Sequence, residues 1–212
     1  MNKLCIRTVG LLVTIGFISG CCSWNYSKED FEFTQNELAL MGAYNIGDTI
    51  YFESNFGDID TITVVEFSEE RHKGSKCFIS RKPSNYMAIN ISHLPSRITK
   101  YPSTKWTTDK NGKDVTYQSL ISISKSPLDS IKKTEYVISF KGFTTLENIF
   151  ENSPNEFIIN GKTLSNCYKV THGYPERVTN PDDIETVYWT PKYGLTAYTN
   201  KVGETWVIKN LD

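Results

Sequence analysis

Several features that would predict a catalytic or metal-binding protein are scarce in this chain of 212 residues. It holds only three histidines, and it has no Cys-x-x-Cys pair, paired-histidine spacing or His-Glu-x-x-His motif that would predict a metal site. Neither a Gly-x-Ser-x-Gly motif nor a Cys–His signature indicates a catalytic unit. The formal net charge is only −1, which gives no electrostatic reason to bind nucleic acid. We therefore expect no enzyme, no cofactor and no metal.

The chain also lacks an apolar run long enough to span a bilayer as a helix, which takes about 20 residues. Its longest apolar run, residues 9–18, follows Lys3 and Arg7 and precedes two small residues and a cysteine. A basic start, a short apolar core and small residues before the cleavage point are typical of a secretory signal peptide. We expect residues 1–20 to be removed from the mature protein.

The cleavage region differs from the usual Ala-x-Ala and resembles the lipobox of bacterial lipoproteins. Residues 18–21, Ile-Ser-Gly-Cys, match its aliphatic, small, small and cysteine positions. The resemblance implies cleavage between Gly20 and Cys21 and attachment of lipid to the Cys21 sulfur. The alternative is ordinary secretion, with Cys21 and Cys22 as plain thiols.

Residues 21–33 are expected to form a lipid-carrying tether. Within them, residues 28–30, Lys-Glu-Asp, resemble the signal that directs lipoproteins of Bacteroides-type bacteria to the cell surface. A solvated, charged linker is an equally good interpretation. Because no aspartate follows Cys21, the enterobacterial inner-membrane retention signal is absent. The resemblance thus implies the outer membrane as location and as partner, with the leaflet undecided.

Two further cysteines, Cys77 and Cys167, leave two alternatives open. An oxidising envelope permits a disulfide that closes a loop of about 90 residues. The other interpretation, which we favour, is two separate buried thiols that act as small apolar residues. A sequence cannot place two Cα atoms within the roughly 7 Å that a disulfide requires.

From residue 34 onward the pattern predicts a single domain, 34–212, that is mainly β with one short N-terminal helix. Thr34 and Glu37 fit a capping box, Leu38, Leu40 and Met41 supply an apolar face, and Gly42 marks a stop. The expected strands are 48–52, 61–67, 76–80, 86–92, 115–124, 135–143, 185–190, 195–199 and 205–208, and residues 157–164 are expected to form a hairpin that continues to residue 171.

Tight turns join these strands. Asn-Gly pairs at 111–112 and 160–161 predict hairpins because both residues tolerate positive φ. The last three strands predict a β-meander. Without a repeat or an internal linker, we expect one antiparallel sheet curved into a half-barrel or a sandwich.

The C-terminal half resembles the ending of uncharacterised outer-membrane lipoproteins of Bacteroides-type bacteria. The resemblance lies in residues 159–163, 166–170, 185–189, 193–195 and 203–206, and includes a Tyr-Gly turn and a Gly-Glu-x-Trp strand. Cys167 stands where valine is more usual, which weakens the case for a disulfide. The family has no assigned activity. Its pattern is also similar to the half-barrels of periplasmic lipoprotein carriers, an analogy at the level of fold alone.

The histidine, aspartate, tryptophan and tyrosine residues, which form catalytic or binding sites in many proteins, are expected to have structural roles in this chain. The histidines are expected to be exposed or in loops. The paired aspartates lack the spacing of a calcium loop, so we expect them to stabilise turns. The tryptophans and tyrosines suit cross-strand packing better than sugar or lipid binding. These residues are His72, His93 and His172; Asp58, Asp60, Asp182 and Asp183; Trp106, Trp189, Trp206, Tyr188, Tyr193 and Tyr198.

The pattern as a whole favours a membrane-anchored envelope lipoprotein with a non-catalytic binding or scaffolding role. The first alternative is a carrier that binds an apolar ligand, such as a lipid or an acyl chain, in the concavity of a half-barrel. The second alternative, an envelope hydrolase, requires histidine, aspartate or serine residues that converge in one pocket.

Overall fold

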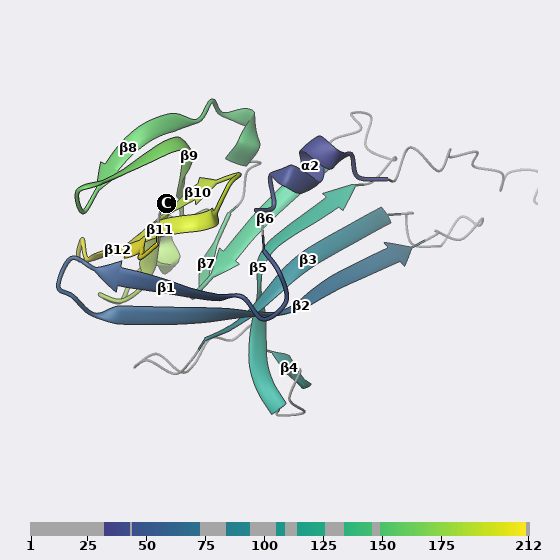
Figure 1. Ribbon diagram of the computed structural model, residues 1–212, viewed down its shortest axis with the longest axis horizontal. Helices are drawn as coiled ribbons and strands as arrows, with labels where there is room; N and C mark the ends of the chain where they lie inside the picture. Colours follow the sequence, from purple (N-terminus) through teal and green to yellow (C-terminus); the bar gives the residue numbers. More distant parts are fainter. Residues whose placement is uncertain are drawn as a thin grey trace, which may run out of the picture.

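The computed structural model describes residues 32–42, 44–72, 84–93, 105–108, 114–125, 134–145 and 149–210. Its strands form one antiparallel sheet that curls into a half-barrel, as expected (Figure 1). In chain order the elements are α2 (Gln35–Ala39), β1 (Thr49–Ser54), β2 (Ile59–His72), β3 (Ser84–His93), β4 (Lys105–Thr108), β5 (Asp114–Lys125), β6 (Thr134–Phe140), β7 (Phe143–Thr144), η2 (Ile149–Glu151), β8 (Asn155–Ile159), β9 (Lys162–Thr171), η3 (Pro175–Arg177), β10 (Ile184–Thr190), β11 (Gly194–Asn200) and β12 (Thr205–Ile208).

The sheet brings the first and last strands of the described chain together. Its order is β7-β6-β5-β3-β2-β1-β12-β11-β10-β9-β8, and β4 pairs with β5 outside this path. Most neighbours in the sheet are therefore also neighbours in the chain, and the β1–β12 pair joins the two halves. The C-terminal meander, β10 to β12, forms as the sequence predicts.

The helix prediction is confirmed together with its cap. The Thr34 hydroxyl accepts a hydrogen bond from the Glu37 N–H, and the Glu37 carboxylate accepts one from the Thr34 N–H. These reciprocal bonds satisfy donors that a helix N-terminus otherwise leaves unpaired. Gly42 follows with φ of +93°. No helix in the described part of the chain is long and apolar enough to cross a membrane.

Two hairpin turns share one geometry, but the sequence predicts only one of them. Asn160 and Gly161 have φ of +49° and +75°, as expected for an Asn-Gly hairpin. Lys141 and Gly142 have φ of +47° and +82°, and they break the continuous strand predicted over residues 135–143. That prediction was wrong because lysine at a positive-φ position is not a turn signal. The predicted strand 76–80 and the pair 111–112 lie outside the described residues.

The β8–β9 hairpin folds over the outer face of the meander. Ile159, Leu164 and Cys167 pack there against Ala197 and Val207 in a small second core. β11 is consequently buried on both faces, whereas most strands of an open antiparallel sheet expose one. At the meander, both the concave face and the outer face of the sheet are therefore covered by other parts of the chain.

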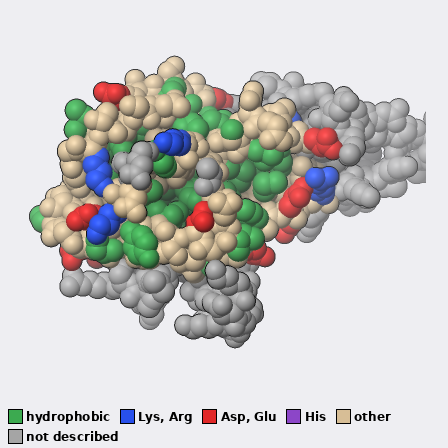
Figure 2. Space-filling view, in the orientation of Figure 1, with side chains coloured by type: hydrophobic (Ala, Val, Ile, Leu, Met, Phe, Trp, Pro, Cys, Tyr) green, Lys and Arg blue, Asp and Glu red, His purple; other side chains and the backbone are tan. Residues whose placement is uncertain are grey.

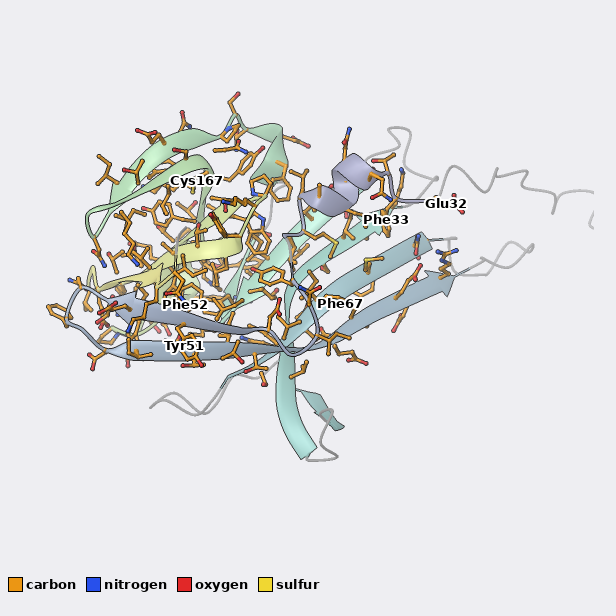
Figure 3. The ribbon with its side chains drawn as sticks, viewed as in Figure 1. Glu32, Phe33, Tyr51, Phe52, Phe67 and Cys167 are labelled. Carbon is orange, nitrogen blue, oxygen red and sulfur yellow. The ribbon has the colours of Figure 1, made fainter. Side chains whose placement is uncertain are left out.

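The main core lies on the concave face of the curled sheet. Its largest fully buried side chains there include Phe52, Phe140, Phe143, Trp189 and Tyr198. The alternation along β1 shows how a strand supplies this core: Phe52 points inward, and its neighbour Tyr51 lies on the other side of the strand and is exposed (Figure 3). The protein's own aromatic rings thus fill the concave face along these strands.

Candidate functional site

The segment before β1 crosses the concave side of the sheet, and residues 32–42 together with Tyr44 are here termed the strap. Its helical end is attached to β5 and β6. Lys125 Nζ donates to the Glu32 carbonyl oxygen at 3.0 Å and pairs with the Glu37 carboxylate at 3.2 Å. The Tyr136 hydroxyl donates to the Glu37 carbonyl oxygen at 3.0 Å. The Thr134 hydroxyl donates to the Glu37 carboxylate.

The other end of the strap is attached to β10 and β11. Trp189 Nε1 donates to the Leu40 carbonyl oxygen at 2.8 Å, and the Leu195 N–H donates to the Tyr44 hydroxyl at 2.7 Å. Tyr44 lies directly on Gly194, where a Cβ atom would stand 2.0 Å from the tyrosine oxygen. Because β6 and β10 are far apart in the sheet order, the strap bridges two distant parts of the half-barrel.

Three aromatic side chains, termed the aromatic row, lie beside the helical end of the strap. Tyr136 contacts Phe150 with ring centroids 4.7 Å apart, and Phe150 contacts Tyr168 at 4.9 Å, both nearly perpendicular. Tyr136 is buried, but Phe150 and Tyr168 are only half-buried. Leu38 and Leu40 of the strap pack against the same core. Hydrophobic side chains gather along the middle of this side of the molecule, and charged ones lie mainly toward its rim (Figure 2).

The Glu37 carboxyl is the titratable group on which the strap attachment depends. Partial burial raises its pKa, but hydrogen bonds from Thr134, Thr34 and Lys125 outweigh burial and hold the pKa below the usual 4.5. A lowered carboxyl pKa contributes stability above the unfolded-state pKa, and that stability is lost as pH falls through the folded-state pKa.

Glu37→Gln is therefore expected to flatten the acid side of the stability profile. Wild-type Tm should fall as pH decreases from about 5 to 3, and the variant's Tm should fall less steeply over that window. Thermal unfolding followed by circular dichroism across this range measures both slopes. Glu69→Gln, which alters an exposed pair with Arg71, is the control and should leave the slope unchanged. Equal slopes for wild type and Glu37→Gln contradict the prediction.

The second notable group is a buried polar cluster formed by Asp60, Lys141 and Tyr198. Lys141 Nζ and the Tyr198 hydroxyl both donate to Asp60 Oδ2 at 2.5 Å. Lys141 Nζ also donates to the Tyr198 hydroxyl oxygen at 3.2 Å. The three residues come from β2, the β6–β7 turn and β11. The side chains of Asp60 and Lys141 are only 1% and 8% exposed.

Aromatic rings surround this cluster. Lys141 Nζ lies 5.1 Å from the Tyr198 ring centroid, 5.5 Å from that of Phe140 and 5.8 Å from that of Trp206. At these distances a lysine side chain makes cation–π contacts with the rings. Trp206 also stacks on Tyr198 with an interplanar angle of 11°. A cluster of an aspartate, a lysine and a tyrosine is a candidate for catalysis in general. Here, however, the three side chains form hydrogen bonds with one another and are buried away from solvent.

Sequence reasoning missed this cluster. Asp60 was expected to serve a turn beside Asp58, whereas the structure leaves Asp58 exposed and buries Asp60 against Lys141. The signal was faint, because Asp58 and Asp60 lie on the same side of an extended chain. Only the start of β2 at Ile59 places Asp60 in the sheet and leaves Asp58 in the turn. The turn interpretation is confirmed for Asp183, whose carboxylate accepts hydrogen bonds from the N–H groups of Thr179 and Asn180.

His172 lies in the loop after β9, as expected, but it is buried and not exposed. Its Nδ1 accepts a hydrogen bond from the Tyr174 N–H at 2.9 Å. Its Nε2 lies 3.1 Å from the Gly142 carbonyl oxygen and donates to it. The ring thus connects the end of β9 to the β6–β7 turn. The side chains of His72 and His93 lie outside the described residues.

The predicted packing role of the aromatic residues is confirmed where the structure describes them. Trp189 is fully buried beneath the strap, Tyr198 is buried in the polar cluster and Tyr188 contacts Phe157 with ring centroids 5.4 Å apart. The side chain of Trp106 lies outside the described residues.

Of the predicted cysteine sites, only Cys167 falls within the described chain. It is a free, fully buried thiol. Burial raises its pKa to about 11, although bonds involving Thr196 and the Trp189 backbone act in the opposite direction. A thiol with so high a pKa is a poor nucleophile at neutral pH. Gly20, Cys21 and Cys77 lie outside the described residues, so the cleavage site, the lipid site and the state of Cys77 stay predictions.

Three turns meet at the end of the molecule away from α2 (Figure 1). The Asn55 N–H and Asn160 Nδ2 both donate to the Thr205 carbonyl oxygen, and the Thr205 N–H donates to Asn55 Oδ1. Large apolar side chains stand exposed on or beside these turns, and this surface is termed the apolar end. Its members are Phe56 (74% exposed), Ile158 (74%) and Val202 (65%).

Within the described residues, no group of three or more histidine, cysteine, aspartate or glutamate side chains is placed to hold a metal ion. The site candidates are therefore the strap with its aromatic row, the polar cluster and the apolar end. No family model, curated protein or solved structure matches this chain.

Proposed function

We propose that this protein is a lipoprotein of the cell envelope, anchored to the outer membrane through Cys21, with a non-catalytic binding or scaffolding role. The lipobox at residues 18–21 supports the anchor, because its match covers all four positions of the motif. Several acyl chains on one cysteine exceed the two signals that stable anchoring requires.

One observation carries the non-catalytic part of this proposal. Among the described residues, one cluster combines side chains of the types that often take part in catalysis. These are Asp60, Lys141 and Tyr198, which lie in the core and form hydrogen bonds with one another. A substrate has no contact with them unless the core opens. Catalytic groups instead need access to a reacting atom within hydrogen-bond reach. The cluster therefore acts as a structural support that holds β2, β11 and the β6–β7 turn together.

The distribution of exposed residues supports a binding role. The strap, whose first two residues are also the last two of the expected tether, begins at Glu32 on the side of the molecule opposite the apolar end (Figure 3). An anchor attached there leaves Phe56, Ile158 and Val202 facing away from the attachment. Exposed apolar side chains held on hydrogen-bonded turns suit contact with another protein, because little entropy is lost on binding.

Replacing the lipid-bearing residue tests the anchor directly. In a Gram-negative host fed an alkyne-labelled fatty acid, wild-type protein should carry the label and sediment with membranes. Cys21→Ala is expected to lose the label and its membrane attachment. Cys22→Ala is the matched control, since it removes the neighbouring thiol and should keep both properties. Label retained by Cys21→Ala, or its unchanged sedimentation with membranes, overturns the proposal.

A further inference from the structure

We propose that Lys141 and Asp60 condense in the folded protein to an intramolecular amide, with Tyr198 as the proton relay. The buried ion pair of the polar cluster is the reactant, and an amide between Lys141 Nζ and the side-chain carboxyl carbon of Asp60 is the product. This modification is independent of the proposed envelope function, because both reacting groups belong to the same folded domain.

The two reacting groups are already in contact. Lys141 Nζ lies 2.5 Å from Asp60 Oδ2, and the carboxyl carbon that the nitrogen attacks is one bond beyond that oxygen. Both side chains are held in the core, with 8% and 1% of their surface exposed. Folding has thus removed the freedom that two separate reactants would lose, and such positioning raises the effective concentration of the amine by orders of magnitude.

The hydrogen bonds of the cluster lead both of the protons that a departing oxygen needs to the same atom. Nζ donates to Asp60 Oδ2 directly, and the Tyr198 hydroxyl donates to the same oxygen at 2.5 Å. Nζ also donates to the Tyr198 oxygen at 3.2 Å. One proton therefore passes from Nζ straight to Oδ2. A second reaches Oδ2 through the tyrosine hydroxyl, which regains a proton from Nζ in the same step.

The reaction balances without any further reagent. The bond between Nζ and the Asp60 carboxyl carbon forms, and the bond between that carbon and Oδ2 breaks. Of the three ammonium protons, one stays on the amide nitrogen and two leave with Oδ2 as water. Charge is also conserved, because an ammonium and a carboxylate give a neutral amide and a neutral water molecule.

The aromatic surroundings of the cluster favour this product. The rings of Phe140, Tyr198 and Trp206 have their centroids 5.1 to 5.8 Å from Nζ. An ammonium and a carboxylate enclosed in this way have lost hydration, whereas a neutral amide needs much less of it. Exclusion of bulk water also withholds the reactant that would hydrolyse the amide.

The backbone at Lys141 indicates that a lysine side chain is needed at this position. Its φ of +47° lies in a region where asparagine or glycine fits more easily. A residue stays in such a conformation only where its surroundings hold it there. The turn thus directs the amine toward Asp60 at the expense of local backbone preference.

Mass spectrometry of the full chain tests the reaction. Protein purified from expressing cells is incubated in its folded state, sampled over time, denatured and digested with trypsin. The expected product is a branched peptide that contains both Asp60 and Lys141. It is lighter than the two linear peptides together by the mass of one water molecule. The Lys125–Glu37 pair, whose side chains are 13% and 19% exposed, is an internal control and should yield no branched peptide.

Variants separate the proton relay from packing. Tyr198→Phe keeps the ring and removes the hydroxyl, so the rate of amide formation is expected to fall by about 100-fold or more, the usual effect of removing a general acid–base group. Tyr188→Phe removes a tyrosine hydroxyl from the neighbouring strand β10, and it is the matched control that should react at the wild-type rate. Lys141→Arg should give no branched peptide. A cooperative thermal transition shows that each variant is folded.

Resistance to urea gives a second readout. The amide joins residues 81 positions apart, and β5 and β3 lie between β6 and β2 in the sheet. A crosslink across so long a loop restrains the unfolded chain. The reacted protein should therefore unfold at a higher urea concentration than protein that keeps its full mass. This unreacted form is the reference for the stability of variants at Lys141 or Asp60.

Three results overturn the proposal. The first is folded wild-type protein that yields only linear peptides after prolonged incubation. The second is an amide at another lysine, such as Lys125, or one that forms at the same rate in urea. The third is a folded Tyr198→Phe variant that forms the amide as fast as wild type, since the relay would then have no part in the reaction.

Discussion

Replacing Lys141 by alanine is expected to lower the free energy of unfolding by about 3–5 kcal/mol, since removal of one partner of a buried ion pair takes the ammonium counter-charge from the buried carboxylate. The remaining partner is Asp60, whose side chain is only 1% exposed. Tyr198 still donates to the carboxylate, but a neutral hydroxyl does not replace an ammonium charge. The three aromatic rings around Nζ also lose their contact.

Urea unfolding of three variants separates the cost of removing one partner from the net contribution of the pair to stability. The double variant Lys141→Met with Asp60→Leu should recover most of the loss, because apolar replacement of both partners is often neutral or stabilising. Arg71→Ala breaks an ion pair whose side chains are 59% and 43% exposed, and it should cost about 1 kcal/mol or less. If Lys141→Ala costs no more than Arg71→Ala, the cluster does not support the fold.

Gly194→Ala is expected to destabilise the protein by about 2–5 kcal/mol, the sum of a positive-φ penalty and overpacking. Gly194 has φ of +72°, and an added Cβ atom would stand 2.0 Å from the Tyr44 hydroxyl oxygen and 2.3 Å from its ring. Tyr44 must therefore move away, and the hydrogen bond that its oxygen accepts from the Leu195 N–H is lost. The substitution therefore disturbs the end of the strap that is attached to β10 and β11.

Gly203→Ala isolates the backbone part of that effect. Gly203 has φ of +82°, yet an added Cβ atom there meets nothing within 4 Å. We expect it to cost only about 1–2 kcal/mol, the penalty for a left-handed L-residue. Urea unfolding compares the two, and limited proteolysis reports whether the strap is released in Gly194→Ala alone. Equal losses of stability in both variants would show that Tyr44 adapts to the extra methyl group.

The sequence predicts those parts of the fold that depend on nearby residues. The capping box at Thr34 and Glu37, the Asn160–Gly161 turn and the C-terminal meander all form as expected, because each rests on side-chain chemistry within a few residues. The Lys141–Gly142 turn was missed because tertiary contacts of the lysine side chain, and not its local propensity, support its backbone conformation.

The candidate site depends on contacts that a single sequence does not reveal. Glu37 is recognisable as a capping residue, but its bonds to Lys125 and Thr134 span 88 and 97 residues. The position of Trp189 against Leu40 likewise follows from the curl of the sheet and not from any motif. Periodicity predicts which residues face inward along one strand, whereas it does not predict which distant segments meet across a curved sheet.

The position of the strap in the chain has a consequence for the order of events during synthesis. Residues 32–44 leave the ribosome early, but the groups that hold Leu40 and Tyr44 follow 149 and 151 residues later. Contacts of such high sequence separation form late, because a long loop must close first. The domain is thus complete only after β11 has been made. A chain that finishes folding so late stays open during translation, which is the state that the proposed export of this protein requires.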